Sequence, residues 1–71
     1  MEVRSLREWR IAKALEQREL ARRAGIGVAT LYNLERGLSR GYPRTWRKLA
    51  EALGVEPLQI LEYRQARGQR A

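Results

Sequence analysis

The sequence has no cysteine, no histidine and no aspartate among its 71 residues. Without cysteine there is no disulfide framework, and without cysteine or histidine the usual zinc and iron ligands are missing. Thiol and imidazole chemistry are excluded for the same reason. The eight glutamates are scattered along the chain and form no constellation suited to acid–base catalysis. We therefore expect no enzyme, no metal site and no cofactor.

Long apolar runs are also missing. No stretch approaches the roughly 18 apolar residues of a membrane span, and the charged residues Glu2, Arg4 and Arg7 have no apolar block behind them. We therefore expect a cytoplasmic protein with no leader and no membrane association. A chain this short makes one small domain at most, and its 44% hydrophobic residues suffice for a small core. The sequence predicts a domain at residues 1–64 and a basic, disordered tail at 65–71.

Basic residues dominate the charge. Thirteen arginines and two lysines stand against eight glutamates, which leaves a net charge of +7. The segment 36–48 is the most basic, with five positive charges and no negative one. A small protein with this balance is expected to bind a polyanion.

Apolar residues recur at helical spacing, and no strand-like alternation bounded by hairpin turns is present. Ser5 and Glu8 have the spacing of a capping box, and Gly25 and Gly54 are suited to end helices in the left-handed conformation. The fold class expected is all-α, with five helices. Their predicted bounds are about Ser5–Ala14, Gln17–Ala24, Val28–Arg36, Pro43–Leu53 and Pro57–Arg64.

The aromatic residues allow two interpretations. Trp9 and Trp46 lie on the apolar stripes of their helices, which favours packing in the core over a role as base-stacking platforms. For Tyr42 and Tyr63 both interpretations stay open.

The second and third predicted helices are separated only by Gly25 and Ile26. The third helix directs two leucines inward and presents small and polar residues outward, which is the geometry that lets one helix lie in a DNA groove. The apolar and small positions of this unit are Leu20, Ala21, Ala24, Ile26, Leu31 and Leu34.

Over residues 5 to 62 the sequence resembles the helix-turn-helix family of phage repressors and Cro, also called XRE-type regulators. The resemblance extends beyond the two-helix unit into the first helix and the end of the fourth. It is carried by Arg10, Leu15, Gln17, Leu20, Ala21, Gly25, Ile26, Leu34, Glu35, Gly37, Ala52, Leu53, Gly54 and Val55.

The resemblance implies that the third helix reads DNA bases in the major groove. Five of its residues occupy the outward positions. Valine and alanine at the first two can only pack on a thymine methyl group, or else make no base contact, so hydrogen-bonded readout falls to the other three. These five are Val28, Ala29, Thr30, Tyr32 and Asn33.

The resemblance also implies contacts to the DNA backbone. Gln17 would bond a phosphate and brace the third helix, and the loop beyond that helix would clamp the sugar-phosphate chain, unless it is an ordinary solvated basic loop. The expected backbone residues are Gln17, Gly27, Arg36, Ser39, Arg40 and Arg44.

Arg10 and Glu35 are expected to form a partly buried salt bridge that braces the fold, again by resemblance. Three other positions depart from the family pattern. Ala14 stands where glycine often ends the first helix, while Glu16 and Gly27 stand where serine or threonine usually caps the next two. These departures predict a reduced stability margin.

Taken together, the sequence predicts a double-stranded DNA-binding transcriptional regulator, acting as a repressor at the nucleoid. One such domain covers a half-site, so either a homodimer on a two-fold related site or very weak binding by the monomer is expected, with residues 58–63 as the candidate dimer interface. The alternative is an antitoxin or bridging adaptor that binds a partner protein through the same fold, although no toxin-wrapping segment is visible.

Overall fold

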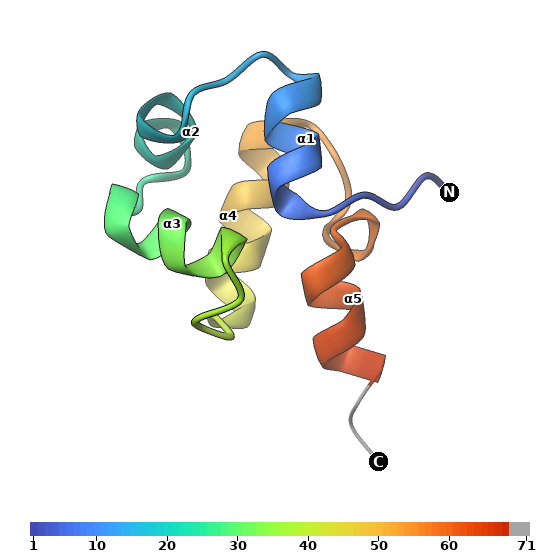
Figure 1. Ribbon diagram of the computed structural model, residues 1–71. Coiled ribbons are helices and arrows are strands. Elements are labelled where there is room, and N and C mark those ends of the chain that lie inside the picture. The colour runs from blue at the N-terminus through green and yellow to red at the C-terminus, as the bar shows by residue number, and fades with distance from the viewer. Residues whose placement is uncertain (69–71) are drawn as a thin grey trace.

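The fold is a small helical assembly in which α1, α2 and α3 surround the central helix α4, with α5 at its side (Figure 1). The computed structural model describes residues 1–68. Within that range the chain forms five α-helices and no sheet, as predicted. The helices are α1 (Leu6–Ala12), α2 (Gln17–Ala24), α3 (Val28–Glu35), α4 (Pro43–Leu53) and α5 (Leu61–Gly68), with a short 3₁₀ turn η1 (Pro57–Gln59) before α5.

Helix α1 begins as predicted but ends earlier. Ser5 accepts a hydrogen bond from the Glu8 amide at 3.1 Å, and its own N–H donates to the Glu8 carboxylate at 2.9 Å. Hydrogen bonding of the Glu8 carboxylate by the Ser5 backbone N–H, and secondarily by the Ser5 hydroxyl, holds the pKa of Glu8 below its ordinary value. The helix was expected to reach Ala14 but stops at Ala12, because Ala14 lies in the left-handed region with φ of +58°.

The start of the last helix was also predicted wrongly. Pro57 opens only the 3₁₀ turn, and Ile60 is then extended before α5 begins at Leu61. Burial explains the break, since the extended backbone directs the fully buried Ile60 side chain into the core. Helix α5 then continues to Gly68, beyond the expected end at Arg64. Residues 65–68 of the predicted tail are therefore helical, and 69–71 lie outside the described residues.

The core is a single apolar cluster to which all the helices except α5 contribute. Both tryptophans belong to it, which confirms that they pack rather than form exposed platforms. No polar or charged residue within 1–68 is wholly buried, although the side chain of Glu35 is almost entirely withdrawn from water. The core residues are Leu6, Trp9, Leu15, Leu20, Ala21, Ala24, Leu31, Leu34, Trp46, Leu49, Ala50, Leu53 and Ile60.

The beginning of the chain is bound to the segment that precedes α5. The Arg4 amide donates to the Gln59 carbonyl at 3.0 Å, and the Leu61 amide donates to the Arg4 carbonyl at 2.8 Å. The indole N–H of Trp9 also donates to the Gln59 carbonyl, at 2.7 Å. In addition, the Glu62 carboxylate accepts from the Leu6 amide at 2.8 Å, so a side chain of α5 caps the start of α1.

The left-handed backbone at Ala14 leads to a stability prediction. A residue with a Cβ atom pays roughly 1–2 kcal/mol to adopt this conformation, and glycine does not, although glycine gains entropy in the unfolded chain. We expect Ala14→Gly to raise the free energy of unfolding by about 0.5–1 kcal/mol. Thermal and urea unfolding followed by circular dichroism would measure the change.

The matched control is Ala66→Gly, at an exposed position inside α5. That substitution should lower stability, because glycine in a right-handed helix costs about 0.5–1 kcal/mol. Destabilisation by Ala14→Gly similar to that of the control would contradict the argument.

Candidate nucleic-acid interface

The α2–α3 unit presents one face of α3 to solvent. Gly25 ends α2 with φ of +71°, and the Ile26 amide returns to the Ala21 carbonyl at 2.9 Å, which turns the chain sharply. Leu31 and Leu34 are buried beneath α3. The five residues predicted to read bases are all exposed on the opposite side, namely Val28, Ala29, Thr30, Tyr32 and Asn33.

Glu35, the last residue of α3, is held by side chains from two other helices. Its carboxylate accepts from Arg10 Nε at 2.6 Å and from the second terminal nitrogen of Arg10 at 3.1 Å. Gln17 Nε2 donates to the same carboxylate at 3.1 Å. The remaining terminal nitrogen of Arg10 donates to the Leu15 carbonyl at 2.9 Å. The predicted salt bridge is therefore present, and it is one part of a larger network.

This network is largely withdrawn from water. Only 3% of the Glu35 side chain and 13% of the Arg10 side chain are exposed. A two-pronged arginine–carboxylate pair fixes orientation as well as distance. The end of α3 is thereby fastened to α1 and to the first turn of α2.

The same network shapes the charge of the surface. Between Leu20 and Ala50 the chain carries seven basic residues and a single acidic one, Glu35. Because the Glu35 carboxylate is turned inward and neutralised by Arg10, it does not offset the basic charges around α3. The exposed face of α3 itself carries no carboxylate. An anionic partner meets no acidic group of this segment on that face.

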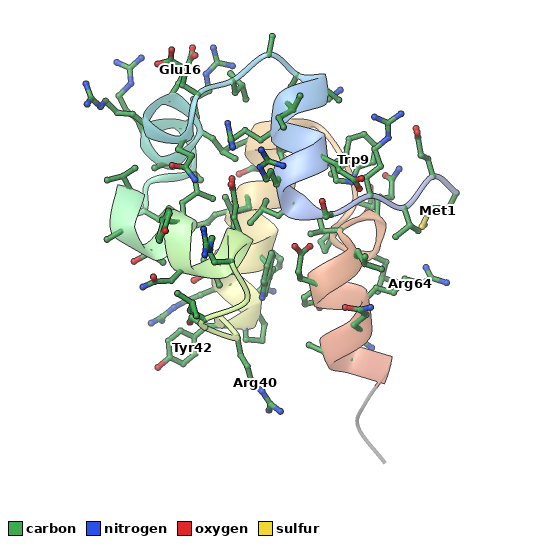
Figure 2. The ribbon with its side chains drawn as sticks, viewed as in Figure 1. Met1, Trp9, Glu16, Arg40, Tyr42 and Arg64 are labelled. Atoms are coloured by element: carbon green, nitrogen blue, oxygen red, sulfur yellow. The ribbon has the colours of Figure 1, made fainter. Side chains whose placement is uncertain are left out.

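The loop that follows α3 is basic, exposed and anchored. Gly37 turns the chain with φ of +74°, and the Leu38 amide donates to the Asn33 carbonyl at 2.8 Å. Further along, the indole N–H of Trp46 donates to the Arg40 carbonyl at 2.8 Å. Figure 2 shows Arg40 and Tyr42 projecting from this part of the molecule. The buried indole thus holds the loop backbone while the side chains remain in solvent.

Gly41 fits this loop tightly. Its φ is +74°, and a Cβ atom there would come within 2.8 Å of Leu34 Cδ2 and 2.9 Å of Trp46 Nε1. Only glycine satisfies both the backbone conformation and the close approach. The course of the loop is therefore set by its contact with the core.

The predicted backbone-binding residues lie in α2, just before α3, in the loop that follows α3, and in the first turn of α4. Gln17 is the first residue of α2 and is half-buried, since its amide bonds Glu35, which agrees with the expected brace. Gly27 precedes α3 and provides no side-chain cap for that helix. Glu16 likewise provides none for α2. The remaining four residues, Arg36, Ser39, Arg40 and Arg44, are exposed in or next to the loop.

Two aromatic–arginine pairs were not predicted. The Arg36 guanidinium lies 5.5 Å from the centroid of the Tyr32 ring, and that of Arg44 lies 5.7 Å from the Tyr42 ring. The first pair has the i, i+4 spacing of helical neighbours, which the sequence could have indicated. The second depends on the loop conformation, so no sequence signal identified it.

Within residues 1–68 the chain has neither a metal-binding cluster nor a membrane-spanning helix. No group of three or more acidic side chains is arranged to hold a metal ion. None of the helices in that range has both the length and the hydrophobicity needed to cross a bilayer.

The buried network predicts a large effect for loss of Arg10. Arg10→Ala would leave the Glu35 carboxylate buried without its main partner, at a cost on the order of 3–5 kcal/mol. A domain this small has little stability to spare, so we expect the variant to be largely unfolded at room temperature. Circular dichroism and thermal melting would measure this.

Arg23→Ala is the matched control, because Arg23 pairs with Glu19 at 2.9 Å on the exposed surface. Exposed pairs of this kind contribute about 0.3–0.5 kcal/mol. Equal melting temperatures for the two variants would show that the network does not brace the fold.

The comparison with protein families agrees with the geometry. The sequence profile of the helix-turn-helix family, of XRE type, matches residues 6–60. Comparison with curated proteins and with solved structures finds no significant match. The matched range runs from the first residue of α1 to Ile60, which packs in the core, and so includes the α2–α3 unit and the basic loop. The chain belongs to the XRE-type helix-turn-helix family of DNA-binding regulators.

Proposed function

We propose that this protein is a sequence-specific transcriptional regulator that binds double-stranded DNA by placing α3 in the major groove. The observation that carries the proposal is the internal neutralisation of Glu35. It leaves an uncharged, exposed face of α3 next to a loop whose charged groups are all positive. Such a face can approach base edges while the neighbouring arginines meet the phosphates.

Base recognition in this arrangement comes from a few side chains of α3. Asn33 can donate to and accept from an adenine edge, and Val28 and Ala29 suit the methyl group of thymine. Thr30 and Tyr32 add hydroxyl groups on the same face. The proposed target is therefore rich in A·T pairs at the positions that face the start of α3.

Backbone contacts supply most of the affinity in this proposal. The amide of Gln17 and the backbone at Gly27 lie at the starts of α2 and α3, where helix dipoles favour phosphate. Arg36, Ser39 and Arg40 approach the strand from the loop. Arg44, in the first turn of α4, completes the set.

A homodimer on a two-fold related site completes the proposal. A single short recognition helix reads only a half-site, and pairing two domains gives the length that specificity requires. Leu58 and Leu61, near the start of α5, are large apolar residues exposed on the surface, which supports this region as the contact between protomers. Bound near a promoter, such a dimer would exclude the transcription machinery and so act as a repressor in the cytoplasm.

Selection of binding sites from random duplex DNA tests the proposal. We expect an enriched site with two-fold symmetry, half-site centres about 10 base pairs apart or a multiple of that, and A·T steps facing α3. With about five phosphate contacts per domain, the logarithm of the binding constant should fall with the logarithm of salt concentration at a slope of about −4 to −5 per domain. The absence of any enriched site, or a flat salt response, would overturn the proposal.

Two substitutions separate base reading from backbone contact. Asn33→Ala should weaken binding to the selected site by about 1–3 kcal/mol and leave binding to scrambled DNA nearly unchanged. Arg40→Gln should weaken binding to both duplexes and reduce the salt slope by about 1 for each domain. Fluorescence anisotropy at several salt concentrations measures both effects.

Arg64→Gln provides the control, because the Arg64 side chain projects from α5 away from the loop (Figure 2). It removes one charge at a distance from the proposed interface, so affinity and salt slope should remain close to those of the unchanged protein. If Arg64→Gln weakened binding as much as Arg40→Gln, net charge alone would explain the affinity and the proposed docking would be wrong.

A further inference from the structure

A groove separates the loop after α3 from helix α5. It has a volume of about 690 Å³ and is lined by residues of the loop, of α4 and of α5. That volume lies within the range of about 300–1,000 Å³ usual for sites that bind small molecules. None of its lining residues is acidic, and three are arginines, namely Arg40, Arg47 and Arg67.

Aromatic side chains form the wall between the arginines. The rings of Trp46 and Tyr63 lie with centroids 6.4 Å apart and planes tilted by 50°. Arg67 is held against Tyr63, with its guanidinium 5.9 Å from the ring centroid and one terminal nitrogen 3.4 Å from the hydroxyl. Trp46 is itself oriented by its bond to the Arg40 carbonyl. The groove therefore combines positioned aromatic surface with guanidinium groups from three elements.

The electrostatics of the groove favour an anion. Pro43, the first residue of α4, lines it, and this eleven-residue helix has no side-chain cap. The positive end of the helix dipole consequently lies at the rim. Among residues 1–68, none of the ion pairs involves Arg40, Arg47 or Arg67, so these charges are not offset by a paired carboxylate.

We propose that this groove binds a small organic anion with a flat apolar body, such as an aromatic carboxylate. Tyr63, which is half-buried, and the small part of Trp46 that the core leaves exposed take the apolar body, and the arginines take the carboxylate. An inorganic anion would use only the arginines, and a neutral aromatic molecule would use only the wall. The structure thus favours a ligand that carries both groups.

Occupancy of the groove has a consequence for DNA binding, and this step rests on the proposed function. Arg40 both lines the groove and belongs to the loop proposed to clamp the DNA backbone. A carboxylate that engages Arg40 withdraws it from the phosphate. The ligand would therefore weaken DNA binding and act as an inducer that competes for one side chain.

Naphthoate is a suitable probe, with naphthylmethanol and naphthylmethylammonium as neutral and cationic analogues of the same apolar body. The chain has two tryptophans, so we expect two indole N–H signals in nitrogen-15 NMR of the protein alone, and the second signal serves as an internal control. We expect naphthoate to shift the Trp46 signal saturably with Kd of about 0.1–1 mM, as the size of the ligand allows. The signal of Trp9, whose indole N–H is bonded to Gln59 elsewhere in the core, should stay in place.

Two groove variants, one on α4 and one on α5, are compared with a control on α5. Arg47→Gln and Arg67→Gln should each weaken naphthoate binding about three- to tenfold, because each removes one exposed charge-assisted contact. Arg64→Gln alters α5 outside the groove and should leave the affinity unchanged. Three results would overturn the site. They are equal affinities for the three naphthalene compounds, a shift of the Trp46 signal that does not saturate, and equal losses of naphthoate affinity in Arg64→Gln and Arg67→Gln.

Competition is measured separately, by anisotropy of the selected duplex with increasing naphthoate. If naphthoate displaces DNA and naphthylmethanol does not, and if the displacement is weaker in Arg67→Gln, the result supports the shared use of Arg40. Undiminished DNA binding at saturating naphthoate overturns the competition. If naphthoate shifts the Trp46 signal saturably but the protein binds no duplex, the groove is upheld as a site and the proposed function is rejected.

Discussion

The carboxylate of Glu35 connects three helices, and the exposed surface of α3 depends on that connection. Arg10 reaches it from α1 and Gln17 from α2, while Arg10 also bonds the Leu15 carbonyl between those helices. A buried ion pair contributes little net stability when compared with an apolar substitute, but it costs a great deal when broken. Its value here lies in orientation, since the planar guanidinium accepts few alternative arrangements. The end of α3 is held at one angle to the rest of the domain.

The same carboxylate also determines what a partner encounters. In an exposed position it would place a negative charge at the end of α3, next to Arg36 and the loop. Held inside, it leaves the basic character of the surface intact, so a single interaction serves both the fold and its electrostatics. The loop has a comparable dual role, because the Trp46 indole fixes the Arg40 backbone while the Arg40 side chain stays in solvent.

Much of the fold follows from local sequence patterns. The bounds of α2 and α4 were predicted correctly because Gly25 and Gly54 end them in the left-handed conformation. Other features depend on tertiary contacts that no local pattern reveals. Helix α1 ends at Ala12 because Ala14, two residues later, adopts the left-handed conformation, and Ile60 interrupts the last helix because the core requires its side chain. Some features of the candidate site can be predicted from local sequence and others cannot. The exposure of the predicted α3 residues follows from helical periodicity, whereas the groove between the loop and α5 exists only in the assembled fold.

The contact between Arg4 and the segment at Ile60 has a consequence for how the protein is made. The first residues of the chain pair with residues more than fifty positions later, and Trp9 bonds the same segment. Closure of this long loop carries an entropic cost that the last core residue, Ile60, must help to offset. Until residues 59–62 are in place, the Trp9 indole N–H lacks its acceptor and the start of α1 lacks its Glu62 cap. A polypeptide truncated before Gln59 loses these bonds together with the core residue Ile60, and is therefore less stable and more open to proteolysis.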